Sequence, residues 1–295
     1  MLRRCVLVER TTEYAELLAR HGTREQARFF LEQRGLRIED VERRHTATEA
    51  ARRLVLGAIP AEWRRANVER AELDRFLFEP EDVIVVLGQD GLVANAAKYL
   101  DGQPVIGLNP DAERNPGVLV PHPPQAVTDL IRDVERGRQQ VEARTMARAR
   151  LDDGQVLHAL NELFIGHRTH QSARYALSFR GATERQSSSG VIVTTGTGAT
   201  GWAASIVNGR ARPLELPGPT DPRLAFFVRE AWPSPGTGTG ITEGAFAPPD
   251  EVTIACELGE GGVVFADGIE ADRLEPQWGQ SVTVTVADRR LMLVR

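Results

Sequence analysis

An apolar run that ends at a glycine-flanked carboxylate constrains this chain more than any other feature. Residues 83–87 are a short, unbroken apolar segment, followed by Gly-Gln-Asp-Gly at residues 88–91 and a helical pattern to about residue 101. Such runs are typical of strands that a parallel sheet buries on both faces. Glycines let the backbone approach a ligand, and the first amides of a helix attract anions. The stretch predicts a parallel α/β sheet with an anion site beside Asp90. The alternative is an ordinary strand-to-helix turn with Asp90 as N-cap.

The first part of the chain alternates strand and helix. Strand patterns cover residues 5–8, 83–87 and 104–108, and helical patterns cover residues 13–21 and 24–34. This alternation predicts a doubly wound α/β domain over residues 1 to about 122. Asp90 and Asn109 each follow the carboxyl end of a strand, which is where such sheets bind ligands.

The pattern changes after the proline-rich residues 121–124, where we place a domain boundary. Residues 125–138 have a helical pattern typical of a connecting helix. Later segments are short, rich in β-branched residues and separated by turn residues: 155–165, 173–179, 191–195, 252–257, 262–266 and 281–286. Their spacing predicts a linker helix and a mainly β domain over residues 123–295.

Charge and cysteine content exclude several classes of function. The net charge is −5, so no global field favours nucleic acid or an anionic membrane. We find no membrane-spanning run and no secretory signal, and Cys5 and Cys256 are far apart, which is typical of reduced thiols in a cytosolic protein. A P-loop is excluded, because the only lysine, Lys98, is not part of Gly-x-x-x-x-Gly-Lys. We expect Lys98 on a solvated helix face.

An amide and a carboxylate stand side by side within one apolar segment of the second half. Asn161 and Glu162 interrupt residues 155–165, which we interpret as one strand. Buried polar groups are costly unless they are hydrogen-bonded. An adenine would satisfy both, because Asn can pair with a base edge and Glu can accept from an amino or hydroxyl group. The alternative is a strand end or a turn capped by Asn161.

Small residues and hydroxyls dominate residues 187–202, where a strand runs into a Gly- and Thr-rich turn that ends at Trp202. Such a turn can lay its backbone against a nucleotide, with an aromatic ring nearby for a base. A Gly/Thr-rich turn without function is the alternative. His167 and His170 are the only spaced histidine pair, and we expect a surface turn there rather than a metal site.

Three of these segments, in this order, together resemble the NAD kinase family. They are Gly-Gln-Asp-Gly-Leu at residues 88–92, Asn161-Glu162, and the turn from Ser189-Gly190 to Trp202. Residues 104–114, 159–166 and 228–230 are most similar to the mitochondrial-type branch. The resemblance covers the chain from about residue 83 to its end. It implies an α/β domain followed by a β-sandwich-like domain, with the site between them.

The resemblance implies transfer of a phosphoryl group from ATP, with Mg²⁺, to the 2′-hydroxyl of the adenosine ribose of NAD. Asp90 would act as base or orienting group at that hydroxyl, and no residue is assigned as a metal ligand. Residues expected to bind the nucleotides are Gly88, Gly91, Asn109, Asn161, Glu162, Ser189, Gly190, Thr197, Gly198, Thr200, Trp202 and Ser205. In this family the position of Ser189 can reach a neighbouring subunit's ligand, so a homodimer or higher oligomer is implied.

Two residues depart from the family's first motif. Gln89 replaces a glycine and Leu92 replaces a hydroxyl residue, so we predict poor ATP binding and slow turnover. One alternative is a nucleotide-binding or regulatory protein on the same scaffold. Another is a kinase for a different hydroxyl acceptor, against which the Asn161-Glu162 pair argues.

Overall fold

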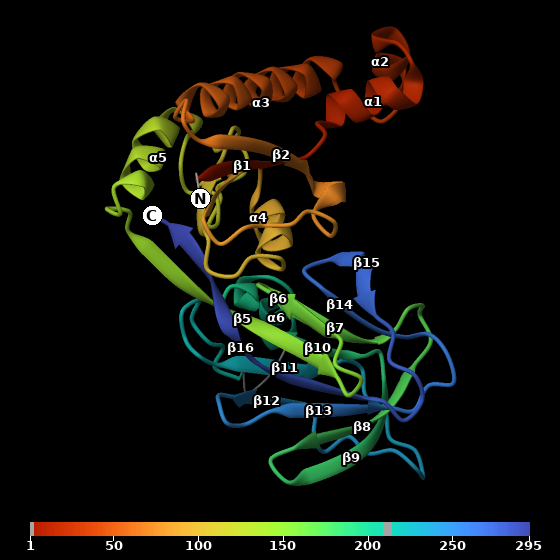
Figure 1. Cartoon of the computed structure of the whole chain (residues 1–295). Helices are drawn as coiled ribbons and strands as arrows, with labels where there is room; N and C mark the ends of the chain where they lie inside the picture. Colours follow the sequence, from red (N-terminus) through yellow and green to blue (C-terminus); the bar gives the residue numbers. More distant parts are fainter. Residues whose placement is uncertain (1–2, 209–213) are drawn as a thin grey trace. The chain divides into compact units, whose positions relative to one another are not determined.

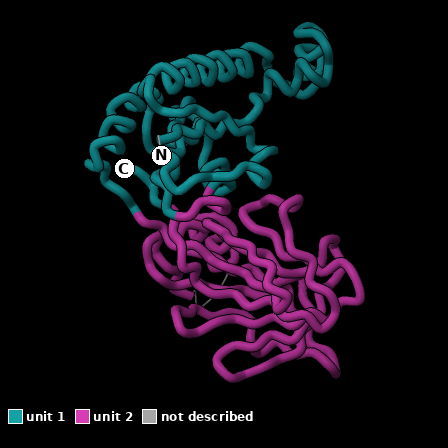
Figure 2. Tube along the Cα trace, in the orientation of Figure 1, with its two compact units in different colours: residues 1–96, 102–142, 292–295 teal, residues 97–101, 143–291 magenta. Residues whose placement is uncertain are grey.

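The computed structural model describes residues 3–208 and 214–295, and the chain divides into two compact units (Figure 2). Unit 1 comprises residues 1–96, 102–142 and 292–295, and unit 2 comprises residues 97–101 and 143–291. No helix in the described part of the chain is long and apolar enough to cross a bilayer.

Unit 1 is built on a parallel sheet of strand order β2-β1-β3-β4. The strands are β1 (Arg4–Glu9), β2 (Arg64–Glu69), β3 (Asp82–Leu87) and β4 (Pro104–Leu108). Every residue of β3 is buried, as expected for a strand covered on both faces. Helices α3 (Ile38–Ala58) and α5 (Val127–Glu135) pack on one face, and α4 (Asp90–Ala97) lies on the other (Figure 1).

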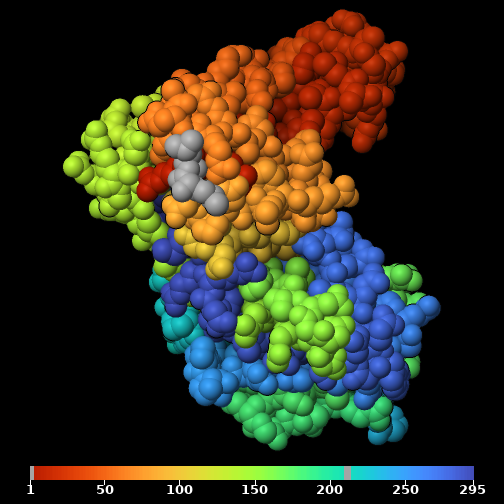
Figure 3. All heavy atoms as spheres, in the orientation of Figure 1, coloured from red at the N-terminus to blue at the C-terminus, as the bar shows by residue number. Residues whose placement is uncertain are grey.

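Two further helices, α1 (Glu13–His21) and α2 (Arg24–Glu32), pack against the first turns of α3. Thr12 and Thr23 cap α1 and α2 by accepting a backbone N–H. Their shared apolar cluster is small: Leu17, Ala27, Leu31, Ile38 and Val41. These helices form the red part of the surface in Figure 3.

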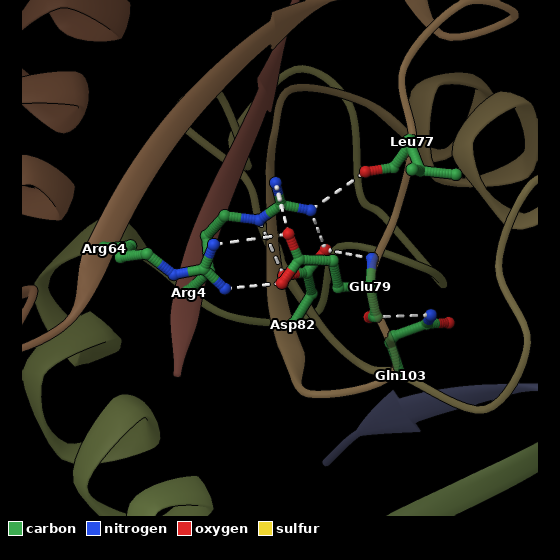
Figure 4. A network of polar contacts seen from close by, with 6 residues as sticks. All are labelled: Arg4, Arg64, Leu77, Glu79, Asp82 and Gln103. Carbon is green, nitrogen blue, oxygen red and sulfur yellow. Dashed lines mark hydrogen bonds and ion pairs between the residues drawn. The ribbon is translucent and has the colours of Figure 1, made fainter. Parts of the chain in front are cut away.

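A buried ion pair joins the amino ends of β1 and β3 (Figure 4). Arg4 donates from Nε and Nη2 to the two carboxylate oxygens of Asp82, at 2.8 and 2.6 Å. Asp82 is 1% exposed, so loss of Arg4 would leave a buried charge unpaired. The pair fixes the register of these strands at the edge opposite Asp90.

Unit 2 packs two largely antiparallel sheets face to face. One sheet contains β5 (Val141–Leu151), β6 (Val156–Ala159), β8 (Ala173–Phe179), β9 (Ala182–Ser188), β13 (Val252–Cys256) and β16 (Ser281–Val294). The other has the order β12 (Glu243–Phe246), β11 (Leu224–Val228), β10 (Val191–Thr194), β7 (Glu162–His167), β14 (Gly262–Ala266) and β15 (Ile269–Leu274). The largest apolar core lies between them and includes Leu163, Leu177, Phe226 and Ile254.

The expected fold class, an α/β domain followed by a mainly β domain, is confirmed. The chain differs from the sequence-based elements in several places. The expected strand at residues 155–165 is two strands, β6 and β7, and α4 ends at Ala97 rather than near residue 101. Helix α5, which we expected as the linker at the start of the second domain, belongs to unit 1 because it packs on α3 and β4.

Candidate functional site

The turn after β3 holds a second loop of unit 1 through the Asp90 carboxylate. Gly88 donates its N–H to the Leu108 carbonyl at 3.0 Å, and α4 begins at Asp90. The carboxylate of Asp90 accepts the backbone N–H groups of residues 118, 119 and 120, at 3.0, 2.8 and 3.2 Å. Asp90 is therefore the first residue of α4 rather than its N-cap, and its side chain fixes a loop nearly thirty residues away in sequence.

The other predicted residues of unit 1 differ in burial and in whether their polar groups already form hydrogen bonds within the protein. Asn109 is buried, and its side chain donates to the Asn115 carbonyl at 2.7 Å and accepts the Asp111 N–H at 3.0 Å. The loop after β4 therefore uses this amide. Gly91 and Gln89 are exposed, and a Cβ added at Gly91 would meet open space.

Leu92 is buried and packs toward Gly88, where an added Cβ would lie 3.2 Å from Leu92 Cδ2. Leucine at this position therefore contributes to the packing of α4. It supplies no hydroxyl to a ligand.

Asn161 and Glu162 lie where β6 gives way to β7, not inside one strand as expected. The physical reason is Asp267, whose carboxylate accepts the N–H groups of Leu160, Asn161 and Glu162 at 2.9, 2.7 and 3.2 Å. These bonds turn the backbone out of the extended ladder. The alternative interpretation, a turn, is the arrangement observed, although Asp267 caps it rather than Asn161.

The Gly- and Thr-rich turn after β10 donates hydrogen bonds to backbone carbonyls of residues 160 and 161. Thr195 donates its N–H to the Asn161 carbonyl at 2.9 Å and its hydroxyl to the Leu160 carbonyl. Gly198 is required for this approach, because a Cβ there would overlap the Asn161 carbonyl. The structure thus brings Gly198 against the backbone of Asn161, and Thr197 precedes Gly198 in the same turn.

The side chains of Asn161 and Glu162 are left available for a ligand. No residue that the structure describes hydrogen-bonds to either side chain, although both are half-buried. Burial, reinforced by the charge of Asp267, raises the pKa of Glu162 to about 7. Burial also raises the pKa of Asp267 to about 6, against the three N–H donors and Lys98, which lower it. A half-buried amide and a carboxyl group on a fixed backbone form a site for a polar ligand edge.

An aromatic cluster lies on the same face of the sheet as Glu162. Glu162 and Phe164 alternate with core residues along β7, so both point away from the main core. The Phe164 ring stacks at 6.1 Å from Trp202 and 4.9 Å from Phe265, measured between centroids. The Arg229 guanidinium lies 4.9 Å from the Trp202 ring centroid. The rings thus pack against one another on this face of the sheet.

The remaining predicted residues are more dispersed. Ser189 and Gly190 precede the first residue of β10, whereas Thr195 follows its last residue, so they lie at the far end of that strand from Asn161. Thr200, the last residue of a short 3-10 helix (Gly198–Thr200), and Ser205, in α6 (Trp202–Val207), are both exposed. Thr197 accepts a hydrogen bond from Arg144 Nη1 at 3.3 Å.

Lys98 is buried, which corrects the expectation of a solvated helix face. Helix α4 ends one residue earlier, and Lys98 pairs with Asp272 on β15, with Nζ 2.8 Å from Oδ2. Tyr99 donates its hydroxyl to the same carboxylate. Burial alone would raise the pKa of Asp272, but these two hydrogen bonds hold it below its usual value.

Sequence reasoning assigned no individual role to Asp267, Arg144 or Thr195. The Asp267-Gly268 pair between two strand patterns is a hairpin signal, yet nothing local indicates that its carboxylate serves a segment a hundred residues earlier. His167, expected on a surface turn, is buried at the end of β7 and bonds to Thr169. Within the described residues no group of three or more His, Cys, Asp or Glu could hold a metal ion.

Comparison with known proteins gives a consistent set of relatives. No family model matches the chain. NAD kinase 2, mitochondrial, from Rattus norvegicus is 29% identical over 194 residues, which cover 50% of this chain and 46% of the rat protein. The chain spans about half the length of the relatives it matches.

Two solved structures share the fold over 99% of this chain. They are yeast NADH kinase complexed with NADH, at TM-score 0.60 and 15% identity over 83% of that chain, and an NAD kinase from Archaeoglobus fulgidus in complex with ATP, at TM-score 0.57 and 18% identity over 93% of that chain.

Proposed function

The chain belongs to the NAD kinase family, and from this premise we propose that it transfers the γ-phosphoryl group of ATP to the 2′-hydroxyl of the adenosine ribose of NAD or NADH. The product is NADP or NADPH. The relatives named above supply the class of reaction, and the residues of the two units supply the proposed roles.

The observation that carries this proposal is the turn at residues 160–162. Its backbone N–H and C=O groups form hydrogen bonds with Asp267 and Thr195. The backbone of the turn is therefore held in place, while its two polar side chains form no hydrogen bond to the described residues. Asn161 would pair with the base edge and Glu162 would bind an amino or hydroxyl group of the adenosine. We assign the acceptor nucleotide to this turn.

Asp90 would orient the attacking hydroxyl or take its proton. Its carboxylate already accepts three N–H groups, so it has room for about one further hydrogen bond. That capacity suits one hydroxyl better than a metal ion. Mg²⁺ binds chiefly through substrate phosphates and water in such sites, which is compatible with a chain whose described residues form no metal-binding cluster.

The direct test incubates purified protein with Mg-ATP and NAD or NADH and measures NADP(H) with an NADP-specific dehydrogenase. We expect NADP(H) that depends on both substrates. If NAD binds in calorimetry but no NADP(H) forms, the second candidate, a nucleotide-binding protein on this scaffold, replaces the first; the exposed Gln89 in the donor loop favours that candidate. A homo-oligomer and a cytosolic location are part of the same proposal, and chromatography with light scattering would test the first.

A further inference from the structure

Asp267 stands in an unusual backbone conformation at the turn between β14 and β15. Its φ is 52°, in the left-handed region that few residues other than Gly, Asn and Asp adopt readily. Its N–H donates to the Glu162 carbonyl at 3.1 Å, while its carboxylate accepts from residues 160, 161 and 162. One residue therefore contacts the segment through both its backbone and its side chain.

We propose, on the basis of the function proposed above, that Asp267 is a positioning residue of the acceptor-nucleotide site. It holds the backbone of residues 160–162 in the turn that presents Asn161 and Glu162 to an adenosine-containing acceptor. Asp267 itself does not touch the nucleotide in this arrangement, because its oxygens are directed at the three amides.

Three backbone N–H groups point at one side chain, so that side chain must offer acceptor atoms and no donor of its own. A carboxylate has two oxygens and about four lone pairs, whereas an asparagine amide has one oxygen and an NH₂ group that would face an N–H. The charge is also supported locally, because the Lys98 ammonium lowers the pKa of the Asp267 carboxyl. Asparagine is therefore a suitable test substitution: it tolerates the left-handed φ, removes the charge and replaces one of the two acceptor oxygens with an NH₂ donor.

Unit 2 offers a matched control in Glu184. This carboxylate also holds a loop, by accepting the N–H groups of Gly240 at 2.9 Å and Ile241 at 3.0 Å. That loop contains none of the predicted binding residues. Glu184→Gln and Asp267→Asn therefore impose the same chemical change on two loops of one unit.

The experiment measures the NAD dissociation constant by calorimetry, and the melting temperature, for the wild type and both variants. We expect Asp267→Asn to weaken NAD binding by roughly tenfold to a hundredfold, the equivalent of one lost charge-assisted hydrogen bond. Glu184→Gln should keep the wild-type affinity even where its melting temperature falls by a similar amount.

Wild-type affinity in a folded Asp267→Asn protein would overturn this inference and leave the proposed function intact. An equal loss in both variants would overturn it as well, because the effect would then be general destabilisation. A wild type that binds no NAD would overturn the proposed function itself. Hydrogen exchange of the wild type adds a test that needs no variant: the amides of Leu160, Asn161 and Glu162 should be protected in the ligand-free protein, and exchange at the rate of exposed loops would contradict the role.

Discussion

Two loops of this chain, residues 117–120 of unit 1 and residues 160–162 of unit 2, are each held by one carboxylate that accepts three backbone N–H groups. In unit 1 the holding group is Asp90, the residue expected to act at the hydroxyl. In unit 2 the holding group is Asp267, and the residues expected to bind the nucleotide lie on the loop that is held. In unit 1, therefore, the residue expected to act on the substrate is also the residue that holds the loop. In unit 2 these two roles fall to different residues.

The largest effect should follow from Asp90→Asn. The change removes the carboxylate from the hydroxyl, and we expect turnover to fall on the order of 10²-fold or more, as for a lost general base. NAD affinity should survive, because the acceptor turn belongs to unit 2. Steady-state turnover and calorimetry check both statements, and unchanged turnover in a folded variant would remove Asp90 from the mechanism.

Gly117→Ala tests whether Asp90 matters because it holds the loop or because it acts at the hydroxyl. An added Cβ at residue 117 would lie 3.1 Å from Asp90 Oδ1 and would overlap the Val120 side chain, so it disturbs the loop but keeps the carboxylate chemically intact. We expect a smaller fall in turnover than for Asp90→Asn. An equal fall would mean that loop geometry, rather than the chemistry of the carboxylate, limits the rate.

The next effect concerns Asn161 and Glu162, whose side chains form no hydrogen bond to the residues that the structure describes. Asn161→Ala or Glu162→Ala should weaken NAD binding by about 1–3 kcal/mol, the value of an unmade polar contact. The melting temperature should stay near that of the wild type, because the turn is held through its backbone. Equal NAD affinity in calorimetry would show that the adenosine does not bind at this turn.

The same contrast explains how far the sequence predicts the site. The apolar runs of β3 and β4 and the residues that follow them are local signals, so Asp90 and Asn109 were found at the ends of strands. The break between β6 and β7 depends on Asp267, and the burial of Lys98 depends on Asp272. Such partners are set by the pairing of distant strands, which no local pattern contains. Helix α3 was missed because its apolar residues do not repeat at helical spacing along one face.

Substitutions of Gln89 and Leu92 test the loop that is proposed to bind ATP. Gln89→Gly should raise the rate with ATP and leave NAD affinity unchanged, because it lets the backbone approach phosphate. Leu92→Thr restores a hydroxyl, and the double variant should be faster than the wild type with ATP. The structure adds a cost of about 1–3 kcal/mol in stability, because Leu92 is buried. Wild-type turnover already at roughly 1–100 s⁻¹, normal for kinases, would show that Gln89 does not obstruct the donor.

The smallest effect is a pH dependence of stability that originates in unit 2. Burial and the charge of Asp267 raise the pKa of Glu162 to about 7, above its usual value of 4.5. The folded state therefore binds this proton more tightly than the unfolded state, and its contribution to stability is complete below pH 4.5 and is lost as pH rises through 7. Between pH 8 and 6.5 the melting temperature of the wild type should rise, by about 2–4 °C for each kcal/mol gained.

The matched variant for this effect is Glu162→Gln, which cannot titrate and should show a flatter profile over the same interval. The opposite contribution of His158 grows as the pH falls through 6.5, because burial lowers the pKa of that imidazole to about 4 and the unfolded state then binds the extra proton. The comparison is therefore confined to the interval above 6.5, where Glu162 dominates. Parallel profiles for the two proteins would mean that Glu162 is ionised throughout, and its carboxylate would then be a pure acceptor toward the nucleotide.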